Sequence, residues 1–179
     1  MTTLRNSISG AALTSVLVLT AVTPALADSA RAAEPLAPQA TKAQKLSKMK
    51  SVTAESAASQ DRWFAALGKR NTPSIKKYRF TWDTDSCSWA PDKLPGGYDL
   101  KFPCWRHDFG YRNYKRIIGA PAFRRDHKKR VDKAFLHDMN RVCDKFVWAD
   151  PFTPAQRKEL KANCKKTAKK YYSTVRSFN

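Results

Sequence analysis

Residues 104–114, CWRHDFGYRNY, place a cysteine, a histidine and an aspartate within one predicted helix. His107 and Asp108 are neighbours in the chain, so on a helix their side chains point about 100° apart. They therefore cannot act on each other as a base and its orienting acid, and each needs a different partner. A histidine held by a separate carboxylate can serve as a general base, and an aspartate facing a loop can bind a metal.

Asp132 is the candidate partner of His107. It lies beside Val131 in the apolar stripe of another predicted helix, where a carboxylate is costly unless a donor satisfies it. An imidazole N–H from His107 would satisfy Asp132 and fix the tautomer of the ring. The other ring nitrogen would then be free to act as a base.

Asp108 is predicted to face the loop that precedes its helix, where Asp85 lies two residues before Cys87. A disulfide between Cys87 and Cys104 would bring the two carboxylates close together. Two carboxylates and the carbonyls of an irregular loop form a hard oxygen site, which suits calcium outside the cell.

The cysteine count supports this arrangement. The chain has four cysteines, and in an exported protein an even number predicts disulfides. Three pairings are possible, and we favour Cys87–Cys104 with Cys143–Cys164 because each closes a short loop between neighbouring elements. No C-x-x-C pair is present, which disfavours a zinc site.

The N-terminus has the features of a secretory signal over residues 1–27. Arg5 precedes a short apolar run, and the run ends in a small-x-small cleavage site at residues 25–27. Residues 28–44 are rich in Ala, Pro and Lys and predict a flexible leader or propeptide. We expect an extracellular protein with one domain over residues 45–179.

Apolar periodicity predicts an all-α domain, because few strand signals appear. A proline- and glycine-rich loop over residues 71–100 follows the first helix. Thr153 and Pro154 have the residue types of a helix start. The predicted helices cover about residues 54–69, 101–118 with Gly119 at its end, 122–147, and a last helix from Pro154 through Phe178.

The same residues resemble a known family. CWRHDFGYRNY matches every specified position of Cys-x-Arg-His-Asp-Phe-Gly-Tyr-Arg-Asn, the active-site helix signature of the microbial secreted phospholipases A2. TDSC resembles that family's calcium loop, RVDKAF the segment with its supporting aspartate, and ESAASQDRWFAA its amino-terminal helix. The resemblance extends from about Ala54 to the end and implies a small helical domain with two antiparallel active-site helices.

The resemblance also implies roles for individual residues. His107 would be the general base that activates a water, Asp132 would orient it, and Tyr111 would hydrogen-bond Asp132. The implied reaction is hydrolysis of the sn-2 ester of a glycerophospholipid with calcium as cofactor. The implied calcium ligands are the carboxylates of Asp85 and Asp108 and the backbone carbonyl of Ser86.

Net charge leaves a second interpretation open. Lys and Arg number 34 against 15 Asp and Glu, for a net charge of +19, which favours anionic surfaces. A non-enzymatic cationic protein that binds anionic membranes or wall polymers is the alternative to the hydrolase. Nucleic acid is expected to bind only non-specifically, because no recognition motif accompanies the charge. For the hydrolase we expect a monomer acting at a phospholipid membrane or micelle surface that is anionic.

Overall fold

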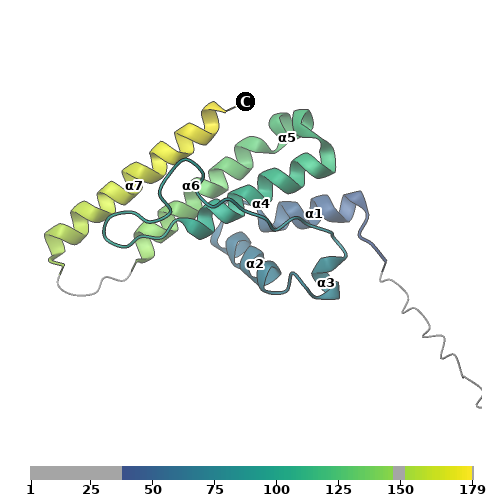
Figure 1. Ribbon diagram of the computed structural model, residues 1–179, viewed down its shortest axis with the longest axis horizontal. Helices are drawn as coiled ribbons and strands as arrows, with labels where there is room; N and C mark the ends of the chain where they lie inside the picture. The colour runs from purple at the N-terminus through teal and green to yellow at the C-terminus, as the bar shows by residue number, and fades with distance from the viewer. Residues whose placement is uncertain (1–37, 147–151, 179) are drawn as a thin grey trace, which may run out of the picture. The chain divides into compact units, whose positions relative to one another are not determined.

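The computed structural model describes residues 38–146 and 152–178, and this part of the chain is helical with no strand (Figure 1). The predicted all-α class is therefore confirmed. The helices are α1 (Lys42–Val52), α2 (Ala57–Gly68), α3 (Pro73–Lys76), α4 (Lys101–Ile118), α5 (Ala120–Asp126), α6 (Lys128–Lys145) and α7 (Pro154–Ser177).

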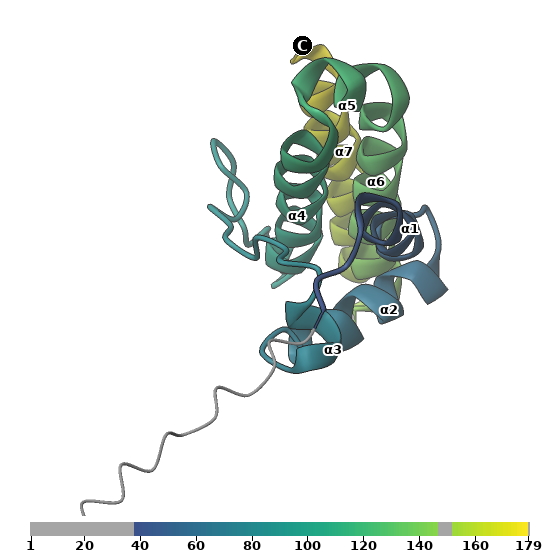
Figure 2. The same cartoon turned by 90° about the vertical axis from the view of Figure 1, so that its right-hand side faces the viewer.

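Helices α4 and α6 are antiparallel neighbours, as predicted. Arg106 pairs with Asp138 near the start of α4, whereas Tyr114 stacks on His127 near its end. Along α4 the residue numbers rise from 106 to 114, while those of the partners at α6 fall from 138 to 127, so the two helices run in opposite directions. Figure 2 shows the two helices side by side with α7 behind them, and in Figure 1 α6 lies between α4 and α7. This pairing places His107 and Tyr111 of α4 against Asp132 of α6.

Both predicted disulfides are present. Cys87–Cys104 ties the loop before α4 to its first turn, and Cys143–Cys164 joins α6 to α7. The second encloses a segment with a sequence separation of 21, for which the chain-entropy model gives about 3 kcal/mol of stabilisation. The first bond fixes the loop before α4 to that helix, and the second fixes α7 to α6.

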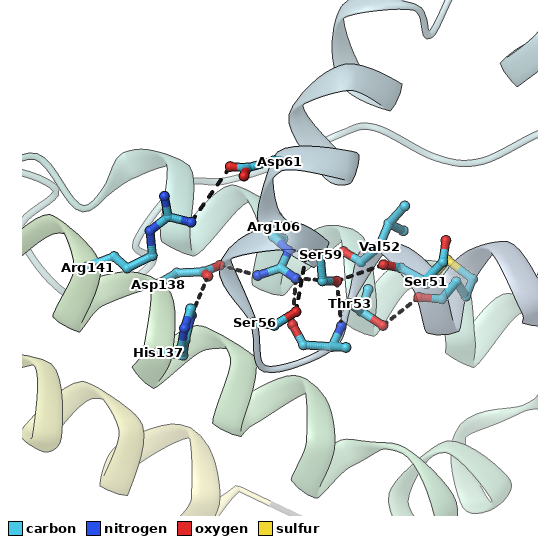
Figure 3. Close-up of polar contacts among 12 residues, drawn as sticks. Ser51, Val52, Thr53, Ser56, Ser59, Asp61, Arg106, His137, Asp138 and Arg141 are labelled. Atoms are coloured by element: carbon cyan, nitrogen blue, oxygen red, sulfur yellow. Dashed lines mark hydrogen bonds and ion pairs between the residues drawn. The ribbon is translucent and has the colours of Figure 1, made fainter.

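A buried polar network fastens α4 to the connection between α1 and α2 (Figure 3). The Arg106 side chain is buried, and its Nη1 donates to Asp138 Oδ2 at 2.5 Å. Its other nitrogens donate to the carbonyls of Val52 and Ala54 and to the hydroxyl of Ser59. One guanidinium thus satisfies the Val52 carbonyl at the C-terminal end of α1 and also binds the Ala54 carbonyl in the connection to α2.

The N-terminal helices differ from the prediction. The predicted helix over residues 54–69 is confirmed as α2, whereas α1 precedes it and is not predicted. Helix α1 begins inside the predicted leader, residues 28–44, because Thr41 and Gln44 form a capping box. The rest of that range up to residue 37, and the predicted signal 1–27, lie outside the described residues, so these boundaries stay a prediction.

Three further differences occur along the chain. The predicted loop 71–100 contains the short α3, and the predicted helix 122–147 is two helices that break at His127. His127 leaves helical geometry with φ −131° and stacks its ring on Tyr114, a tertiary contact that the periodicity does not report. Phe178 was assigned to a buried face but is 61% exposed, since it follows the end of α7.

None of the helices within the described residues has the length and apolar character needed to cross a membrane.

Replacing Gly110 with alanine is expected to destabilise the protein by about 1–3 kcal/mol, because overpacking forces neighbouring groups to move. A Cβ at Gly110 would lie 2.7 Å from a methyl carbon of Val131 on α6. Gly68→Ala is the matched control, since a Cβ there meets nothing within 4 Å. Denaturant unfolding should show a loss for Gly110→Ala only; equal stability of both variants would contradict this packing.

Candidate active site

A histidine and a carboxylate meet between α4 and α6. His107 Nε2 lies 3.0 Å from Asp132 Oδ1, and the Asp132 side chain is fully buried. The hydroxyl of Tyr111, one turn after His107 on α4, donates to the same carboxylate oxygen at 2.6 Å. With Nε2 donating to Asp132, the other ring nitrogen, Nδ1, keeps its lone pair, and His107 contributes to the wall of a cavity.

The second oxygen of Asp132 has two cationic partners that the sequence analysis missed. Lys128 Nζ lies 3.1 Å from Oδ2, and Arg176 Nη1 lies 3.3 Å from it. Lys128 is buried rather than part of a solvated basic run, because its ammonium also donates to the carbonyl of Val175 on α7. The i,i+4 spacing of Lys128 and Asp132 was a readable signal. Arg176 is 44 residues from Asp132, and nothing local indicates that contact.

These contacts set the charge state of the carboxylate. Burial raises the pKa of Asp132, but the hydrogen bonds from His107, Tyr111 and Lys128, together with the electrostatic attraction of His107, leave the pKa below its ordinary value. Burial and the hydrogen bond to Asp132 raise the pKa of Tyr111 far above its ordinary value. Asp132 is therefore ionised and Tyr111 is a neutral donor, so the carboxylate can orient an imidazole N–H.

The loop before α4 brings Asp85 and Asp108 together. Asp108 Oδ2 accepts from the hydroxyl of Thr84 at 2.7 Å and from the backbone N–H of Asp85 at 3.3 Å. Burial raises the pKa of Asp108 despite the Thr84 bond, and the nearby Asp85 carboxylate raises it further. The Ser88 hydroxyl, which donates to Asp85, helps to hold the pKa of that carboxyl at about 2.

Backbone geometry in this loop is unusual. Ser86 and Trp89 adopt left-handed φ values of 59° and 69°, which cost energy for residues other than glycine. The disulfide of Cys87 and a hydrogen bond from its N–H to Asp92 Oδ1 hold the loop in place. The constraint keeps the segment around Ser86 beside the N-terminal half of α4.

The candidate site opens into a cavity of about 400 Å³ between the loop, α4, α6 and α7. Its size lies in the range of small-molecule sites, about 300–1,000 Å³. His107, Asp108 and Tyr111 contribute polar groups to its lining. Much of the remaining lining is apolar or aromatic and comes from Trp89, Pro91, Phe135, Tyr171, Val175 and Phe178.

The oxygen donors at the loop suit a calcium ion that is bound by few protein side chains. Within the described residues no group of three or more His, Cys, Asp or Glu side chains gathers at one point, so a carboxylate cage is excluded there. Asp85 and Asp108 bring two carboxylates to the loop, and carboxylates are oxygen donors that calcium accepts. Asp85 also pairs with Arg112 at 2.6 Å, but both side chains are well exposed, so the pair is weak.

A family model and two curated relatives match this chain. The family model described as prokaryotic phospholipase A2 matches residues 57–179, more than half of the chain. The chain belongs to the prokaryotic phospholipase A2 family. The match to this phospholipase A2 model spans α2 to α7 and includes all the predicted site residues, whereas α1 precedes it.

Two curated relatives of this phospholipase A2 family member are named secretory phospholipase A2. The protein from Arthroderma benhamiae is 38% identical over 95 residues, which cover 53% of this chain and 57% of the relative. The protein from Beauveria bassiana is 35% identical over 77 residues, which cover 40% of this chain and 39% of the relative. The chain thus spans about two-fifths to three-fifths of the length of these relatives.

Proposed function

We propose that the protein is a calcium-dependent phospholipase A2 that hydrolyses the sn-2 ester of glycerophospholipids. The observation that carries the proposal is the buried Asp132, which holds His107 by one ring nitrogen while the ring borders the cavity. A protein that only presented positive charge would not need this arrangement. Membership of the phospholipase A2 family and the names of the two relatives support the same reaction.

His107 would act as the general base. Its Nδ1 would take a proton from a water molecule as that water attacks the ester carbonyl, and Asp132 would stabilise the imidazolium that forms. His107 would then return the proton to the leaving alkoxide. Tyr111 would hold the Asp132 carboxylate in the orientation that His107 needs, because Tyr111 and His107 bond the same carboxylate oxygen.

Asp85 and Asp108 would hold the calcium ion together with the backbone carbonyl of Ser86. When bound, calcium would polarise the ester carbonyl and neutralise the oxyanion that develops on it. Asp108 follows His107 directly on α4, so the disulfide-anchored loop and the base are held by one rigid element. The left-handed backbone at Ser86 is consistent with a loop held in shape for ligand binding.

Lipid would enter from an anionic surface. The cavity wall carries Trp89, which is 100% exposed, and Phe178, which is 61% exposed, and both can insert among lipid head groups. Lys170 lies at the same cavity and adds positive charge. We propose an exported, monomeric enzyme, in line with the word secretory in the relatives' names.

Replacing Tyr111 with phenylalanine is expected to lower kcat about tenfold. The change removes one hydrogen bond to the Asp132 carboxylate, a bond of the class that contributes about 1.5–3 kcal/mol, and part of that loss reaches the transition state. Micellar assays would give kcat, and a thermal melt would show that the fold is kept. An unchanged kcat would remove Tyr111 from the mechanism.

Calcium binding can be tested separately from turnover. Isothermal titration of Asp108→Asn with calcium is expected to show an affinity at least about tenfold weaker than wild type, because affinity follows ligand charge. Asp126→Asn is the control, since that exposed aspartate pairs only with Arg125 among the described residues. Activity of the wild type should vanish with a chelator. Equal calcium affinity of the two variants would refute the ligand assignment.

A further inference from the structure

A second cleft lies on the molecule, away from the cavity of the candidate active site. Its volume is about 300 Å³, at the lower end of the range for small-molecule sites. It is formed by the start of α1, the segment after α3 and the C-terminal end of α4. The residues that line it are Lys42, Lys45, Arg79, Arg116 and Ile117.

The four cations of this cleft have no acidic partner within the described part of the chain. Arg116 donates to a neutral group, the hydroxyl of Thr81, at 3.1 Å. Some basic residues elsewhere do have an acidic partner: Lys161 and Lys165 both lie 2.8 Å from Asp144 on α6. The sequence has 15 acidic residues and 34 basic ones, so many basic residues must lack an acidic partner. None of the ion pairs among the described residues includes a cation of this cleft.

The backbone adds to the positive field. Lys42 is the first residue of α1, where the helix dipole is positive and acidic side chains are favoured, yet the first turn has none. Arg79 holds a left-handed φ of 51°, an unfavourable conformation for a residue with a side chain. Repulsion at the helix start and backbone strain at Arg79 thus both occur where the cations converge.

The cleft cannot act as part of the catalytic cavity. Arg116 follows His107 by 116 − 107 = 9 residues on α4. Nine residues at about 100° each turn the helix by about 900°, which places the two side chains on opposite faces, about 13 Å apart along the axis. The two sites share no lining residue.

We propose that this cleft binds a phosphate group of an anionic ligand. Two guanidinium and two ammonium groups supply the charge-assisted donors that phosphate oxygens accept, and an anion there would relieve the mutual repulsion of the cations. A carboxylate-bearing protein surface fits less well, because a concave site of this size encloses a compact anion. The phosphate could belong to a soluble molecule or to a lipid head group.

Lys42→Gln/Lys45→Gln is the variant that tests the cleft. Both lysines lie on α1, neither side chain has a hydrogen bond to another described residue, and glutamine has a similar helix propensity. Lys166→Gln/Lys169→Gln is the matched control, with the same loss of charge and the same i,i+3 spacing on α7, at exposed positions outside both cavities. Circular dichroism verifies that both variants fold.

The probe is inorganic pyrophosphate, titrated calorimetrically in calcium-free buffer at fixed ionic strength. We expect wild type and the control to bind with equal affinity and the cleft variant to bind at least about tenfold more weakly. No binding by wild type, or equal weakening in both variants, would overturn the proposal. Micelle hydrolysis should be the same in both variants, so failure of the cleft and failure of the enzyme assignment are distinguishable.

Vesicles of ether-linked phosphatidylglycerol distinguish the two sources of phosphate. These lipids lack the sn-2 carboxylic ester, so the protein cannot hydrolyse them during the binding assay. If sedimentation with vesicles is weaker for the cleft variant than for the control, the ligand is a lipid head group. If the two variants sediment equally while pyrophosphate still discriminates them, the ligand is a soluble phosphate compound. Both results support a phosphate cleft, and loss of pyrophosphate discrimination overturns it.

Discussion

Replacing His107 with alanine is expected to lower kcat for phospholipid hydrolysis by about 10²–10⁴-fold, the contribution typical of a positioned general base. The variant removes the only imidazole that joins the cavity to Asp132 among the described residues. Micellar assays at saturating calcium and lipid would measure the change. The KM for lipid should change far less, because the cavity walls stay in place.

The fold of this variant should be kept. Asp132 would still accept from Tyr111, Lys128 and Arg176, so the buried carboxylate is not left unsatisfied. His137→Ala is the histidine control on α6, since His137 lies outside the cavity lining and is expected to retain kcat. Wild-type turnover by the His107 variant would disprove the proposed mechanism.

Replacing Arg106 with alanine is expected to destabilise the protein by about 3–5 kcal/mol, the usual cost of breaking a buried ion pair. The change leaves Asp138 buried without its cation and removes the donor to the carbonyls of Val52 and Ala54 (Figure 3). Burial already raises the pKa of Asp138 above its ordinary value, so the orphaned carboxyl should take up a proton. Denaturant unfolding at neutral pH would measure the loss.

A double variant isolates the charge from the packing. Arg106→Met/Asp138→Leu removes both charges and keeps apolar volume, so its loss should be smaller than that of Arg106→Ala, although the freed carbonyls still cost energy. An equal loss in the two variants would show that the guanidinium acts mainly through the carbonyls of Val52 and Ala54, because both variants lose those bonds. Arg112→Ala is the exposed comparison, because its pair with Asp85 is solvated.

Local sequence was sufficient where elements are strongly amphipathic or clearly capped. The helix at residues 101–118 and the start at Pro154 follow from apolar spacing, Gly119 and the Thr153 cap. Helix α1 was missed because it buries only Met49 and Val52, and its lysine-rich sequence resembles the preceding leader. The Thr41–Gln44 capping box was the readable signal for that helix.

Long-range contacts explain the rest of the difference. The break at His127 depends on the stacking of its ring on Tyr114, and the approach of Arg176 to Asp132 depends on how α7 folds back along α6. Neither contact has a local pattern. The pairing of His107 with Asp132 was readable because a carboxylate beside a core stripe needs a donor, and the antiparallel helices leave few candidates.

The measurement that tests the central claim most directly is product analysis from a phospholipid with palmitoyl at sn-1 and oleoyl at sn-2. Mass spectrometry would follow the acids released by wild type with calcium, by wild type with chelator, and by His107→Ala with calcium. The account predicts oleate and a palmitoyl lysophospholipid from the first sample alone. Release of palmitate, or oleate release that persists with chelator or without His107, would contradict it.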